Sequence, residues 1–82
     1  MINLKPTKKV IAEFPSIEKE FVKRYNEFKN NPTTRNLTAL AIYWGKWSEQ
    51  RQIFNLESKL TEQQITDIYL TMNDYSKDIQ IF

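Results

Sequence analysis

The chain has 82 residues and a net charge of +2, and it contains neither cysteine nor histidine. This length predicts one small domain, and the two absences exclude disulfides, the usual zinc sites and histidine-based catalysis. The single glycine excludes a glycine-rich phosphate loop, and no stretch approaches the roughly 18 apolar residues of a membrane span. We therefore expect residues 1–82 to form a soluble cytoplasmic protein that is not an enzyme and has no metal, cofactor, membrane contact or small-molecule substrate.

The N-terminal segment, residues 1–15, is compatible with two secondary structures. Its apolar residues from Val10 to Phe14 suit either the alternation of a strand or the apolar side of one helical turn. Pro6 and Pro15 bracket the segment and predict that it is short.

The first helix is predicted over residues 17–29. Ser16 suits the N-cap position behind Pro15, and Asn30 to Pro32 form a stop signal. Its apolar residues recur at helical spacing and predict a buried stripe of Ile17, Phe21, Tyr25 and Phe28.

The second helix is predicted over residues 32–54, with Asn31 as N-cap and Pro32 at the first helical position. It begins near the longest uncharged stretch of the chain, residues 36–45, and we expect it to be the central helix. Gly45 either breaks this helix or marks a place where a second backbone crosses closely. Apolar residues occupy one broad face and also the far side: Leu37, Leu40, Ala41, Trp44, Trp47 and Phe54 on the face, Ile42 and Ile53 opposite.

The third helix is predicted over residues 62–77 by the clearest start signal in the chain. Thr61 and Gln64 match a capping box, and Leu60 with Ile65 matches a hydrophobic staple. An apolar tail, residues 78–82, follows.

These elements predict an all-α fold, a small three-helix bundle. Ile2 and Leu4 alternate near one end of the chain, and Ile79 and Ile81 near the other. This alternation is compatible with a short β pairing of the termini, or with an extra helical turn there, in addition to the three helices.

The core of three such helices cannot bury all of the apolar side chains named above, so we expect some of them to contact another molecule. Charge could orient such docking, because residues 1–35 carry eight Lys/Arg against four Asp/Glu and residues 36–82 carry four against six. The sequence favours a small accessory, inhibitor or adaptor that binds another protein, or a self-dimer, and its composition suits an AT-rich bacterial or phage genome. The candidate partner-binding residues are Ile42, Lys46, Trp47, Arg51, Ile53 and Phe82.

The alternative is a DNA-binding regulator with a degenerate helix-turn-helix at residues 34–54. Gly45 would be the turn glycine and residues 47–54 the recognition helix. Lys46 and Arg51 stand where this motif wants apolar residues, which argues against it. The candidate nucleic-acid-binding residues are Lys19, Lys23, Lys46, Ser48, Gln50, Arg51 and Gln52.

Overall fold

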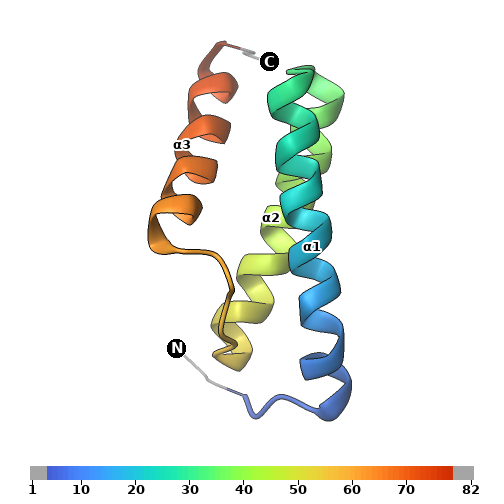
Figure 1. Cartoon of the computed structure of the whole chain (residues 1–82). Helices are drawn as coiled ribbons and strands as arrows, with labels where there is room; N and C mark the ends of the chain where they lie inside the picture. Colours follow the sequence, from blue (N-terminus) through green and yellow to red (C-terminus); the bar gives the residue numbers. More distant parts are fainter. Residues whose placement is uncertain (1–3, 79–82) are drawn as a thin grey trace.

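The computed structural model describes residues 4–78, which form three helices and, over that range, no strand (Figure 1). The helices are α1 (Lys8–Asn30), α2 (Thr34–Phe54) and α3 (Glu62–Asp78). The predicted all-α three-helix bundle is thus confirmed. The suggested strand pairing of the termini needs residues 2, 79 and 81, and the apolar tail runs to residue 82, so both lie outside the described residues.

Helix α1 begins well before the predicted start at Ile17. Thr7, not Ser16, is the N-cap, because its hydroxyl accepts a hydrogen bond from the backbone N–H of Val10 at 3.2 Å. The segment from Lys8 onward is therefore helical, which decides between the two structures that its apolar pattern allowed.

Pro15 lies inside α1, although we expected it to precede the helix. A proline in a helix has no N–H to donate to the carbonyl four residues earlier, here that of Ile11. The helix nevertheless continues, because Phe14 and Glu18 on either side of the proline are both buried. Tertiary packing outweighs the local preference here.

Helix α2, in contrast to α1, starts later than predicted, at Thr34 and not at residue 32. Thr33 is the N-cap and its hydroxyl accepts from the backbone N–H of Asn36 at 3.1 Å. Asn31 is instead the C-cap of α1, where its backbone N–H donates to the carbonyl of Glu27 at 2.9 Å. Pro32 consequently lies in the connection and not at the first helical position.

Gly45 does not interrupt α2, which runs unbroken from Thr34 to Phe54. A helix-turn-helix needs a turn between two helices, so that interpretation of residues 34–54 is wrong. Gly45 also is not a contact point within the described chain, because no atom would lie within 4 Å of a Cβ added there, apart from its own helix backbone and chain neighbours. Asn55 is the C-cap of the helix, and its left-handed backbone (φ 52°) suits this position.

Helix α3 starts as predicted. The backbone N–H of Gln64 donates to the Thr61 hydroxyl at 3.1 Å, and the N–H of Thr61 donates to the Gln64 side chain at 2.8 Å. These two reciprocal bonds confirm the capping box. Leu60 and Ile65, the predicted staple, both pack against the core.

The core lies mainly between α1 and α2, which form a close antiparallel pair (Figure 1). Its buried residues recur every seven positions in both helices, a spacing that keeps one seam facing the partner helix. They are Phe14, Phe21 and Phe28 of α1, Leu40 and Trp47 of α2, and Ile68 of α3.

Helix α3 runs beside this pair at a greater backbone distance (Figure 1). Aromatic side chains of α3 nevertheless contact both helices of the pair. The rings of Phe28 and Tyr75 meet edge to face with centroids 4.8 Å apart, and those of Trp44 and Tyr69 lie 5.8 Å apart. Over residues 4–78, no helix is long and apolar enough to cross a membrane.

Candidate functional site

The strongest polar feature of the structure is the buried carboxylate of Glu18, which is only 7% exposed. Its Oε2 accepts hydrogen bonds from Trp47 Nε1 at 2.9 Å and from the Ser58 hydroxyl at 2.5 Å. Its Oε1 accepts from the backbone N–H of Lys59 at 2.9 Å. One side chain of α1 thus holds both α2 and the connection between α2 and α3.

These contacts keep Glu18 ionised. Burial raises the pKa of the carboxyl, but hydrogen bonds from Ser58, Trp47 and the Lys59 backbone, together with the Lys59 charge, lower it by more. The net result is a pKa below the ordinary value of 4.5. The network therefore rests on a buried negative charge that its donors compensate.

Trp47 connects the buried carboxylate of Glu18 to Arg51, which is partly exposed. Its indole is 1% exposed and stacks on Phe21, with ring centroids 4.8 Å apart and planes 24° apart. The guanidinium of Arg51, one helical turn further along α2, lies over the indole with Cζ 5.2 Å from the ring centroid. The buried network thus supports the ring on which the cationic group of Arg51 rests.

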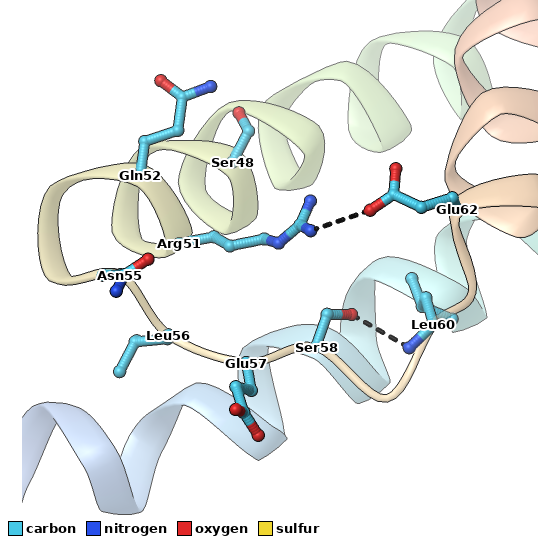
Figure 2. A pocket seen from close by; sticks show the side chains of 9 residues that line it. All are labelled: Ser48, Arg51, Gln52, Asn55, Leu56, Glu57, Ser58, Leu60 and Glu62. Carbon is cyan, nitrogen blue, oxygen red and sulfur yellow. Dashed lines mark hydrogen bonds and ion pairs between the residues drawn. The ribbon is translucent and has the colours of Figure 1, made fainter.

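Arg51 lies in a hollow of about 730 Å³ between the end of α2, the following connection and the start of α3 (Figure 2). We call this the Arg51 hollow. Its lining residues come from α2, the connection and the first turn of α3: Ser48, Arg51, Gln52, Asn55, Leu56, Glu57, Ser58, Leu60 and Glu62.

Within the hollow, Arg51 pairs with Glu62 through one nitrogen, Nη2 to Oε1 at 3.4 Å. This is longer than the roughly 2.7–2.9 Å of a strong charge-assisted hydrogen bond. The Glu62 side chain is 87% exposed, whereas that of Arg51 is 32% exposed. In Figure 2 the carboxylate of Glu57 points away from Arg51.

The hydrogen bonds of Glu18 that support Trp47 beneath Arg51 also hold part of the wall of the hollow, at Ser58. The Ser58 hydroxyl donates to Glu18 and accepts from the backbone N–H of Leu60 at 2.9 Å, a bond drawn in Figure 2. Ser48 donates to the carbonyl of Trp44 at 2.6 Å. The hollow therefore has a preformed shape.

The predicted partner-binding residues do not form one surface. Ile42 (54% exposed) and Lys46 lie on an outer face of α2 with the half-buried Ile53. The prediction that Trp47 binds a partner is wrong, because Trp47 is in the core and cannot contact a docked protein. Its indole stacks on Phe21 and donates a hydrogen bond to Glu18. Of the remaining predicted residues, Arg51 lines the hollow and Phe82 lies outside the described residues.

The predicted nucleic-acid-binding residues are also scattered. Lys19 and Lys23 are exposed on α1, whereas Lys46 is exposed on α2 with its Nζ 5.3 Å from the centroid of the Tyr43 ring. Gln50 is half-buried, with a side-chain oxygen that is shielded from solvent. Only the remaining three come together, at the Arg51 hollow: Ser48, Arg51 and Gln52.

Sequence reasoning missed Glu18, Ser58 and Glu62. A signal for Glu18 was present, because it lies four residues after Phe14 and three before Phe21, on the face that α1 buries. A charged residue inside an apolar stripe needs compensating donors. Nothing local identifies the donors, which come from residues 29 to 41 positions away.

A second hollow of about 360 Å³ lies between α1 and α3. It contains Lys29, whose ammonium lies 5.0 Å from the centroid of the Tyr25 ring, and it has Asp67 on its other side. It is smaller and lacks a buried polar network, so the Arg51 hollow is the better candidate. Among the described residues, no group of three or more acidic side chains could hold a metal ion.

The fold and this site define a small all-α protein with a preformed polar hollow at the C-terminal end of α2. Comparison of the chain with models of known protein families, with curated proteins and with solved structures finds no significant match.

Proposed function

We propose that this protein is a non-catalytic binding protein, an accessory, inhibitor or adaptor, that takes a segment of a partner protein into the Arg51 hollow. The observation that carries the proposal is the position of Arg51, a cation supported by a buried ring inside a preformed hollow. Arginine is among the residues that dominate the binding energy of protein interfaces.

The dimensions and composition of the hollow suit a short polypeptide. A volume of about 730 Å³ falls within the range of about 300–1,000 Å³ that is typical of binding pockets. The amides of Gln52 and Asn55 can bond to peptide groups, and Leu56 and Leu60 offer apolar contact.

Preformation supports binding because ordering side chains on association costs about 0.5–1.5 kcal/mol each. Arg51 already lies over Trp47, and Ser58 is already held by Glu18.

The proposal includes a cytoplasmic location, because a domain of this size without cysteine lacks the disulfides that secreted domains usually need.

The test is selection from a random peptide library against the wild-type protein, followed by binding measurements on two tryptophan variants. Gln52→Trp places bulk at the hollow, whereas Glu49→Trp places the same bulk at an exposed position of the same helix. We expect the selected peptides to bind the wild type and Glu49→Trp and to lose binding to Gln52→Trp.

Peptides that bind both tryptophan variants equally would show that another surface is the binding site. Failure to select any peptide would equally contradict the proposal.

Light scattering at increasing protein concentration measures self-association in a second experiment. A self-dimer that Gln52→Trp dissociates and Glu49→Trp does not would make the occupant a second copy, which also overturns the proposal of a partner protein.

A further inference from the structure

The pairing of Arg51 with Glu62 points to the chemistry of the partner. We infer, on the basis of the function proposed above, that the Arg51 hollow recognises an acidic side chain of the bound segment, whose carboxylate replaces that of Glu62 on Arg51. Glu62 is then an internal competitor for the site, and the partner is a polypeptide segment that contains an aspartate or glutamate.

Arg51 has hydrogen-bonding capacity that its internal pair leaves unused. A guanidinium has five N–H donors and can hold a carboxylate through two parallel hydrogen bonds. Glu62 engages one nitrogen, at 3.4 Å. A ligand carboxylate that approached both terminal nitrogens would gain a shorter and stronger interaction than the internal one.

The internal pair of Arg51 and Glu62 is weak. The Glu62 side chain is 87% exposed, and ion pairs on a protein surface contribute little because water and salt screen them. Glu62 can therefore leave Arg51 at little cost. It also remains favourable in the first turn of α3, where the helix dipole attracts negative charge.

Arg51 cannot follow Glu62 into solvent without losing its contact with the indole of Trp47. The cation stays within the hollow when Glu62 leaves. Glu57, the other carboxylate of the lining, points away from it (Figure 2). An acidic residue of the ligand meets a fixed positive group, and the leucines of the hollow, Leu56 and Leu60, favour an apolar neighbour beside it.

The test uses three N-acetylated tripeptides, two with an amidated C-terminus and one with a free C-terminal carboxylate. The first is acetyl-Leu-Glu-Leu-amide, the second is acetyl-Leu-Gln-Leu-amide, and the third is acetyl-Leu-Ala-Leu with a free C-terminal carboxylate. Binding is followed by NMR through the Arg51 side-chain N–H resonance and the backbone resonances of the hollow. We expect the glutamate peptide to bind about tenfold or more tightly than the glutamine peptide, as loss of a charged hydrogen bond implies.

Four variants accompany the peptides. Arg51→Gln should abolish the preference for glutamate, whereas its control Arg35→Gln, at an exposed position of the same helix, should preserve it. Glu62→Gln should strengthen binding of the glutamate peptide a few-fold by removing the competitor. Its control Asp74→Asn, at an exposed position of α3, should leave that affinity unchanged.

Equal binding of the glutamate and glutamine peptides would overturn the inference, as would an unchanged preference in Arg51→Gln. Stronger binding of the peptide with the free C-terminus would do so too, because it would make the recognised group a chain end. The library selection separates the two proposals. Peptides that need the hollow but carry no acidic residue would refute the inference and leave the proposed function standing.

Discussion

Replacing Glu18 by glutamine tests the buried network on which the hollow depends. The carboxylate accepts three hydrogen bonds, from Trp47, Ser58 and the backbone of Lys59. A hydrogen bond to a charged group contributes about 1.5–3 kcal/mol, and a buried donor left without a partner costs about 1–3 kcal/mol. Glutamine keeps one acceptor oxygen and loses the charge.

We therefore expect Glu18→Gln to lower the free energy of unfolding by about 2–3 kcal/mol. A domain of this length has a total stability of about 4–12 kcal/mol, so the variant should remain folded at room temperature. Urea unfolding followed by tryptophan fluorescence and by circular dichroism measures the change, and the two signals should give the same midpoint.

The matched control is Glu20→Gln. Glu20 is a neighbour in α1 with a side chain that is 39% exposed, and its nearest cation is Arg24 at 3.7 Å. We expect this change to cost less than about 1 kcal/mol. If both variants changed stability by the same small amount, the buried carboxylate would not hold the structure and our reasoning would be refuted.

Acidification should remove the stabilisation that the ionised Glu18 carboxylate contributes. Because the pKa of Glu18 lies below 4.5 in the folded protein, its charge stabilises the fold above that pH. The contribution disappears as the pH falls through the folded-state pKa. The stability difference between wild type and Glu18→Gln should thus be largest at neutral pH and shrink on acidification. A difference that grew in acid would contradict this sign.

Three further predictions concern stability and are checked by the same urea unfolding. Gly45→Ala should stabilise the protein by about 0.5–1 kcal/mol, since the added methyl meets open space in a helix interior; destabilisation would reveal a close neighbour at this face. Pro15→Ala should stabilise it by about 1–2 kcal/mol by restoring an N–H donor for the Ile11 carbonyl, and no gain would mean that the helix is locally adapted to proline. Trp47→Phe should destabilise it by about 2 kcal/mol, and a double-mutant cycle with Glu18→Gln should show coupling of about 1 kcal/mol or more; additive effects would exclude the indole–carboxylate bond.

The sequence by itself determined the fold class and the start of α3. Apolar residues at helical spacing predicted three helices, and Thr61 with Gln64 predicted a cap that the structure contains. These features depend on residues a few positions apart, whose interactions follow from helix geometry alone.

Other local signals were misleading because a stronger or more distant interaction overrode them. Pro15 suggested a boundary, but the buried Phe14 and Glu18 carry α1 through it. Gly45 suggested a turn, but α2 continues past it, between the buried Leu40 and Trp47.

The tertiary structure alone decided the candidate site. Glu18 meets Trp47 across 29 positions and Ser58 across 40, and Arg51 meets Glu62 across 11, so no local pattern joins them. It also decided that Trp47 is in the core while Ile42 is 54% exposed, although both lie in the same apolar helix. A helical pattern specifies which residues share a face, but only the packing of the other helices determines which face is covered.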